Sequence, residues 1–226
     1  MKTNSFSQLS TSRKKPMYPV TGAMREYLQE FHRYVQLPVS YADLRHFRES
    51  ISVKDKAGRD TLWQTAIYTG SETDYLHQGL KKIYALLKAG GDSTTHTHLH
   101  IERIDYCTFG NSNPFRIKIV NDFNDNYDYF YIKQGDASRI FGLELEHILS
   151  PSRIQFFVHE NTLIEEHIAG VPGDHFIQAY LQNTDFNPVR IAKEFVKFNE
   201  RCFVRLLGDM RSYNYVFDIT PDFEEV

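Results

Sequence analysis

The sequence predicts an α+β protein: a five-stranded antiparallel sheet with one packed helix, preceded by a helical N-terminal region and followed by a partly helical C-terminal region. Between residues 98 and 168, five short runs rich in β-branched and aromatic residues are separated by turn residues, and one amphipathic run lies between the third and the fourth. Long stretches on both sides repeat apolar residues at helical spacing. We expect a tail over 1–20, a helical region over 21–92, a sheet domain over 93–170 and a C-terminal region over 171–226.

Composition excludes several classes of protein. Aromatic residues make up 14% of the 226 residues, too many for a disordered chain. The net charge of −3 leaves no basic excess that could bind nucleic acid. The sequence contains no run of 18 apolar residues, the length needed to span a membrane. Two cysteines cannot build a disulfide framework, so we expect a cytoplasmic protein.

The helical region is predicted from periodicity and capping residues. Apolar residues repeat from Thr21 onward, Ser40 resembles an N-cap, and Ser71 with Asp74 resembles a capping box. We expect helices over 21–34, 40–47 and 71–87 and a charged turn over 54–60. Residues 62–69 are expected to form a strand, with a helix as the alternative.

The second half is predicted as three strands, a helix and two strands, followed by a linker, a long helix, a loop and a last strand. We expect strands over 98–109, 115–120, 127–133, 154–158, 162–168 and 215–219, and helices over 138–149 and 188–206.

Two charged residues suggest a phosphate-binding site. Lys133 ends the third strand of the sheet domain, where a lysine can reach nucleotide phosphates as a point charge. On the following helix, Glu144 lies near the middle of the apolar face and Glu146 points the opposite way. A buried carboxylate needs a partner, so we expect an ion pair between Lys133 and Glu144, with Glu146 in solvent.

The third feature is Gly208–Asp209 followed by Asn214, on a loop between a long helix and a short strand. With this motif, residues 98–217 resemble the protein-kinase-like fold, closest to the aminoglycoside-phosphotransferase branch of small-molecule kinases. The resemblance implies that Asp209 accepts or orients the proton of the acceptor hydroxyl and that Asn214 binds Mg²⁺.

The same resemblance implies the nucleotide-binding residues. The segment 164–170, with Glu166 and Ile168, resembles the strand and linker whose backbone holds adenine, and Gly110 and Asn111 lie where a loop would cover the phosphates. The implied ligands are ATP, Mg²⁺ and a small-molecule acceptor that the sequence does not identify.

The sequence departs from the family at its C-terminal end. The chain stops twelve residues after Asn214, about where the family's second metal-binding Asp is expected, and we assign Asp222 and Glu224 to a turn. The chain resembles the front portion of a phosphotransferase. We therefore expect it to bind Mg-ATP weakly and to turn it over no faster than a buffer blank without protein. An uncovered apolar side of helix 188–206 should favour self-association. An alternative is a pseudokinase that binds nucleotide without turnover.

A second alternative is a cupin-like metal-binding protein. His96, His98, His100 and Glu102 alternate, so on a strand they would share one face and could bind zinc, iron or manganese. The second half of the cupin motif is not found in the sequence. We expect a solvated strand face that holds no structural metal.

Overall fold

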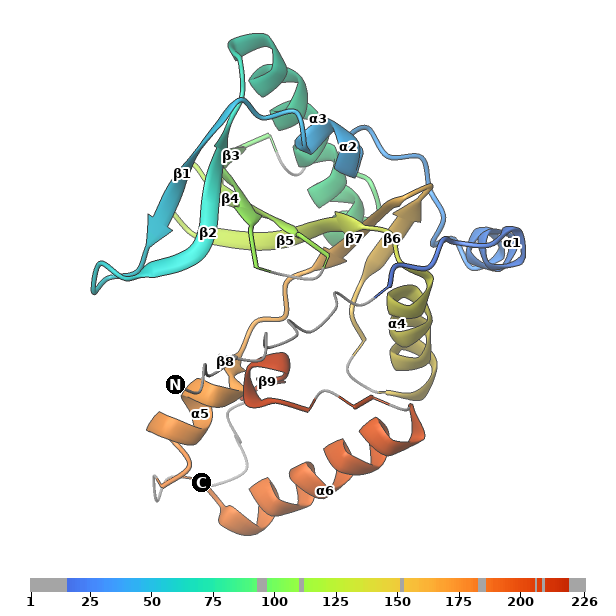
Figure 1. The fold of residues 1–226 in the computed structure, drawn as a ribbon, viewed down its shortest axis with the longest axis vertical. Coiled ribbons are helices and arrows are strands. Elements are labelled where there is room, and N and C mark those ends of the chain that lie inside the picture. The colour runs from blue at the N-terminus through green and yellow to red at the C-terminus, as the bar shows by residue number, and fades with distance from the viewer. Residues whose placement is uncertain are drawn as a thin grey trace, which may run out of the picture. The chain divides into compact units, whose positions relative to one another are not determined.

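The computed structural model describes residues 16–92, 97–109, 112–150, 153–182, 186–205, 207–208 and 210–219. It is an α+β structure that divides into two compact units (Figure 1). The first unit comprises the described residues up to Ile140 together with Phe156–Glu165. The second comprises Phe141–Gln155 and the described residues from Glu166 onward.

The elements follow in the predicted order, with additions. The first unit contains α1 (Gly22–Glu30), α2 (Tyr41–Leu44), β1 (Glu49–Lys54), β2 (Asp60–Ile67), α3 (Gly70–Ala89), β3 (Leu99–Cys107), β4 (Phe115–Asn121), β5 (Tyr127–Gln134), β6 (Phe156–His159) and β7 (Thr162–Glu166). The last residue of β7, Glu166, is assigned to the second unit. Helix α4 (Ala137–Leu149) belongs to both units. The second contains β8 (Val171–Pro172), α5 (Gly173–Ala179), α6 (Pro188–Val204), η2 (Ser212–Asn214) and β9 (Val216–Phe217).

The sheet of the first unit has seven strands in the order β1-β2-β3-β4-β5-β7-β6. The pairs β1–β2, β2–β3, β3–β4, β4–β5 and β6–β7 are antiparallel. The predicted series of three strands, a helix and two strands is therefore confirmed as β3, β4, β5, α4, β6 and β7. The predicted count of five strands in the sheet is wrong, because two strands from residues 21–92 join it: β2, which matches the strand predicted over 62–69, and β1, which was not predicted.

Helix α3 covers one face of this sheet and forms the core with it (Figure 1). Alternate residues of β3, β4 and β5 point toward the helix, as the two-residue repeat of a strand requires. The core consists mainly of Leu76, Leu80, Ile83 and Leu87 of α3, packed with Ile101, Ile104, Phe115, Ile117, Ile119, Phe130 and Ile132 of the sheet.

Helix caps differ from prediction at one place. Ser40 caps α2 in a capping box with Asp43, as expected, although the helix is shorter than predicted. The capping box of α3 is formed by Thr69 and Glu72, and not by Ser71 and Asp74. The helix therefore begins at Gly70, one residue before the predicted start.

The second unit is built around aromatic side chains. Phe176 of α5 stacks on Phe217 of β9 with ring centroids 3.9 Å apart, and Phe198 of α6 packs on Tyr215 at 4.9 Å. The predicted linker before α5 forms strand β8, which pairs with β9. Gly173 is required there, because a Cβ atom would overlap the Tyr215 ring.

The predicted long helix and the strand after it are present as α6 and β9. On the side of α6 away from Phe198, the side chains of Val189, Val196 and Phe203 are exposed. In the described part of the chain, no helix combines the length and apolar character needed to cross a membrane.

Close packing at Gly79 predicts that alanine at this helix position destabilises the protein. A Cβ atom at Gly79, in the interior of α3, would overlap the methyl group of the fully buried Val39. We expect Gly79→Ala to lower the free energy of unfolding by about 1 kcal/mol or more, since overpacking outweighs the gain in helix propensity. Urea unfolding followed by circular dichroism measures this change.

Gly142→Ala in α4 is the matched control, because nothing lies within 4 Å of the added Cβ there. It should raise the free energy of unfolding by roughly 0.5–1 kcal/mol. Equal effects of the two substitutions would contradict the packing argument.

Candidate functional site

Lys133 lies at the end of the sheet where the β3–β4 turn is formed. The register pairs Phe115, the first residue of β4, with Ile132 of β5, and Lys133 follows Ile132. Residues 112–114 precede β4 at this end of the sheet, and Tyr41 Oη donates a hydrogen bond to the Asn113 carbonyl at 3.0 Å. The predicted phosphate-binding lysine therefore lies at the end of the sheet where β4 begins, and Gly110 and Asn111 of the predicted phosphate loop lie outside the described residues.

Lys133 belongs to an ion cluster with Arg139 and Glu165, here called the Lys133 cluster. Lys133 Nζ donates to Glu165 Oε2 at 2.7 Å. Arg139 donates to both carboxylate oxygens, through Nε to Oε1 at 2.9 Å and through Nη2 to Oε2 at 2.7 Å. The Glu165 side chain is 4% exposed, while Lys133 is 16% and Arg139 is 51% exposed. Two cations surround one buried carboxylate, so the cluster carries a net charge of +1.

Burial and charge act against each other in this cluster. Burial raises the pKa of Glu165, but the charges and hydrogen bonds of Lys133 and Arg139 outweigh it, and the pKa falls to about 2. Burial lowers the pKa of Lys133, and the neighbouring Glu165 carboxylate opposes this change. Glu165 therefore helps to keep Lys133 protonated.

The prediction that Lys133 pairs with Glu144 is wrong, because its ion-pair partner is Glu165. Glu144 is buried, as its position on the helix predicted. It lies five residues after Arg139, or about 140° around the helix, so it points in a different direction from the residue of α4 that reaches the cluster. Strand order decides the pairing, because β7 lies beside β5.

The predicted environment of the remainder of α4 also needs correction. Glu146 was expected in solvent, but its side chain is 24% exposed and forms an ion pair with Arg205 after α6. The helix buries Ile140 and Leu143. Other side chains of its predicted apolar face are exposed, namely Phe141, Leu145, Ile148 and Leu149.

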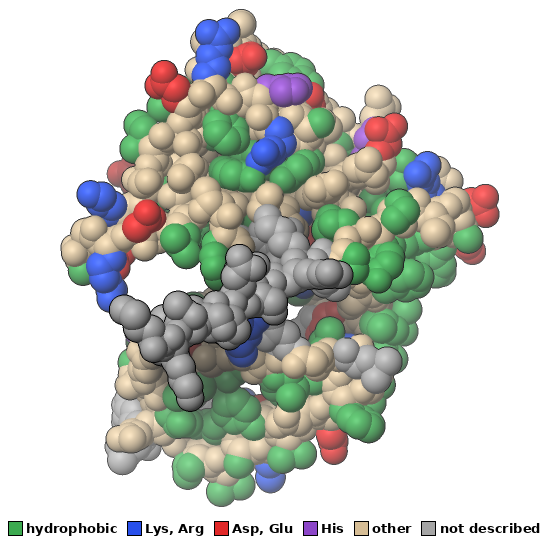
Figure 2. All heavy atoms as spheres, viewed as in Figure 1, with side chains coloured by type: hydrophobic (Ala, Val, Ile, Leu, Met, Phe, Trp, Pro, Cys, Tyr) green, Lys and Arg blue, Asp and Glu red, His purple; other side chains and the backbone are tan. Residues whose placement is uncertain are grey.

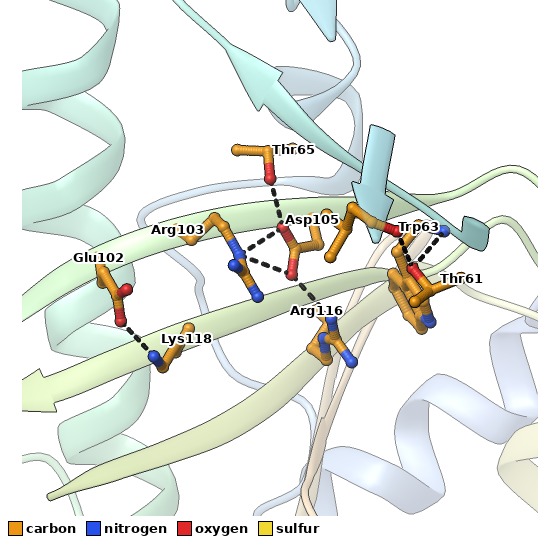
Figure 3. Close-up of polar contacts among 9 residues, drawn as sticks. Thr61, Trp63, Thr65, Glu102, Arg103, Asp105, Arg116 and Lys118 are labelled. Carbon is orange, nitrogen blue, oxygen red and sulfur yellow. Dashed lines mark hydrogen bonds and ion pairs between the residues drawn. The ribbon is translucent and has the colours of Figure 1, made fainter. Parts of the chain in front are cut away.

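A second ion cluster lies on the face of the sheet opposite α3 (Figure 3). The Asp105 carboxylate is fully buried and accepts hydrogen bonds from Thr65 Oγ1 at 2.9 Å and Arg116 Nη2 at 2.9 Å. Arg103 Nε lies 2.8 Å from Asp105 Oδ1. The Arg116 guanidinium also lies over the ring of Trp63, 4.4 Å from its centroid. We call Thr65, Arg103, Asp105 and Arg116 the Asp105 cluster.

The two clusters share this face, which we call the polar face. The register places Arg116 opposite Tyr131, and Lys133 is two residues beyond Tyr131 on the same side of β5. Lys133 Nζ lies 5.4 Å from the centroid of the Tyr131 ring. Tyr131 therefore lies between two cation-rich clusters that each contain one buried carboxylate.

The predicted site residues Asp209, Gly110 and Asn111 lie outside the described part of the chain, as do Asp222 and Glu224 of the predicted turn. Of the other predicted site residues, Asn214, Glu166 and Ile168 belong to the second unit, whereas Lys133 belongs to the first. Asn214 ends η2 in the second unit and is exposed. Glu166 accepts a hydrogen bond from the Gln155 backbone N–H at 2.7 Å, and Ile168 is 43% exposed.

The alternating histidines do not form a described metal centre. His96 lies outside the described residues; His98 stacks on Phe123, and His100 contacts the Asp122 carboxylate. Glu102 forms an ion pair with Lys118 at 2.5 Å (Figure 3), beside an irregularity of the β3–β4 register. No group of three potential ligands is found among the described histidine, cysteine and acidic residues.

Sequence reasoning missed Arg139, Glu165, Asp105 and Arg116. For Glu165, the alternation of side chains along the strand was a usable signal of burial, because Glu165 shares a strand face with the buried Leu163. Choosing Glu165 over Glu144 as the partner required the strand order, because both carboxylates follow Lys133 in buried positions.

The chain matches no protein-family model, no curated protein and no solved structure at a significant level.

The pKa of Glu165 predicts a pH-dependent stability. At pH 7 we expect Glu165→Gln to lower the free energy of unfolding by about 3 kcal/mol, because the buried charge of Lys133 loses its partner. Since the folded pKa of Glu165 lies below the usual value of 4.5, this contribution is complete above about pH 4.5 and is lost as the pH falls toward 2. Urea unfolding at pH 7, 5 and 3 should show the gap between wild type and variant closing with acid.

Glu102→Gln is the control, because Glu102 also pairs with a lysine but is 42% exposed. Its effect should stay within about 1 kcal/mol. A Glu165→Gln effect that does not change between pH 7 and pH 3 would contradict the assigned pKa.

The histidine strand is expected to need no metal. We expect a chelator to leave the thermal unfolding midpoint of protein purified without an affinity tag unchanged, because the side chains of His100 and Glu102 have protein partners. A structural metal would contribute folding free energy directly. A large fall in the midpoint with chelator, or about one equivalent of bound zinc, iron or manganese, would revive the cupin-like alternative.

Proposed function

We propose that this chain binds Mg-ATP at the Lys133 cluster and is the nucleotide-binding part of an ATP-dependent phosphotransferase with a small-molecule acceptor. The observation that carries the proposal is the net positive Lys133 cluster, with a buried carboxylate and a mostly buried lysine, at the end of the sheet where β4 begins. An anionic phosphate would balance its excess charge.

The geometry of Lys133 suits a phosphate ligand. An ammonium group carries three N–H donors, and Glu165 is the hydrogen-bond acceptor that the described residues supply to it. Donors therefore remain for phosphate oxygens, while Glu165 restricts the side chain to one direction. Charge-assisted hydrogen bonds of this kind are stronger in a partly buried site than in water.

The roles of the second unit follow from the resemblance alone. Asp209 would orient the hydroxyl group of the acceptor, and Asn214 would bind Mg²⁺ through its amide oxygen, a ligand type that Mg²⁺ accepts. The order of α6, η2 and β9 supports this assignment, because it is the predicted sequence of long helix, loop and short strand.

The direct test is Mg-ATP binding by isothermal titration calorimetry. Lys133→Met should weaken binding at least tenfold, since it removes a charged hydrogen-bond donor to phosphate. The variant should still fold, because Arg139 continues to pair with Glu165.

Lys118→Met is a matched control. Lys118 lies on the adjacent strand, pairs with Glu102 and is 18% exposed, close to the value for Lys133. It should leave the affinity for Mg-ATP unchanged. Equal affinities of wild type and Lys133→Met would contradict the proposal.

Turnover distinguishes the phosphotransferase from the pseudokinase. Phosphate release from radiolabelled ATP should be compared between wild type and Asp209→Ala. Release that the variant abolishes supports catalysis, whereas Lys133-dependent binding with identical background release supports a nucleotide-binding pseudokinase.

A further inference from the structure

The two outer edges of the seven-stranded sheet differ. Along β6, the chain segment before α2 covers the edge: Val35 N–H donates to the Val158 carbonyl at 3.1 Å, and Val158 N–H donates to Arg33 at 2.8 Å. Strand β1 forms the opposite edge (Figure 1), and no described segment pairs with its outer side. An unpaired edge strand is a template for pairing with another chain.

Strand β1 offers little to oppose such pairing at its centre. The side chains of Ser50, Ile51 and Ser52 are exposed, with Ile51 at 62%, and none of the three is charged. The charges that usually protect an edge strand lie at its two ends. Acidic and basic side chains occur near one another where β1 ends and turns into β2 (Figure 2).

The charges at the ends are arranged as an antiparallel partner of the same sequence would require. Arg48 and Glu49 enter the strand, and Lys54 and Asp55 leave it. When two copies pair antiparallel about a two-fold axis between Ile51 and Ser52, Glu49 lies opposite Lys54 and Arg48 lies opposite Asp55. Opposite charges in directly facing positions stabilise a strand pair. The facing pair of Glu49 and Lys54 carries the argument, because Asp55 already pairs with Arg59 Nε at 2.8 Å in its own chain.

This charge order also selects one register. A shift by one residue in one direction places Arg48 opposite Lys54, and a shift in the other direction places Glu49 opposite Asp55. Both shifts bring like charges together, which destabilises a strand pair. Neither Glu49 nor Lys54 is engaged in an ion pair within the described residues, so both are available to a partner.

We propose that β1 is a self-association surface: a second copy of this chain adds its own β1 antiparallel to the first and continues the sheet across a two-fold axis. The interface is isologous, since each copy contributes the same surface. Its small size makes the dimer weak and sensitive to salt.

Charge reversal tests the register directly. Glu49→Lys alone places lysine opposite lysine at both symmetric pairs, and Lys54→Glu alone places glutamate opposite glutamate. Sedimentation velocity should show wild-type dimers forming as the concentration rises to about 1 mM. Each single variant should dimerise about tenfold more weakly.

An equimolar mixture of the two variants should restore association, because each facing pair then joins lysine with glutamate. A folding defect in either variant could not be repaired by mixing, so restoration identifies the strand pairing itself. Fluorescence anisotropy of one labelled variant, titrated with the other, measures the heterodimer.

Three outcomes would overturn the proposal: a wild-type chain that stays monomeric to about 1 mM, single variants that dimerise as well as wild type, or no gain on mixing. Association abolished by Phe203→Glu but unaffected by either β1 variant would place the interface on the exposed side of α6 instead.

Discussion

Alternation of side chains across the strands determines where the charged groups of the first unit lie. Helix α3 covers one face of the sheet, and the residues of β3, β4 and β5 that point toward it are apolar. Every second residue must then point to the polar face. Asp105, Arg116, Lys133 and Glu165 gather there as a consequence, and the two ion clusters are neighbours because their strands are neighbours.

Stability alone is a weak explanation for the Lys133 cluster. Burying a carboxylate costs several kcal/mol, and replacement of a buried ion pair by apolar residues is often neutral or stabilising. Arg139 and Lys133 compensate the charge of Glu165 and leave one positive charge over. Under the proposed function, a phosphate group would balance that charge.

Local sequence patterns predicted most of the elements. The three strands β3, β4 and β5, helix α4 and helix α6 follow the predicted ranges closely, because periodicity and turn residues report on the chain near each position. The errors have physical causes as well. Strand β1 carries exposed polar residues and acquires its structure from pairing with β2, and β8 is a strand only because β9 lies beside it.

The sequence by itself determined the α+β class, the order of strands and helices from β3 to β7, the position of Lys133 at a strand end and the burial of Glu144. Those properties depend on the spacing of residues along one segment. The partner of Lys133 was decided only by the tertiary structure. Strand β7 returns beside β5 and delivers Glu165 to the lysine, with Arg139 from the first turn of α4, and no local pattern records which strands become neighbours.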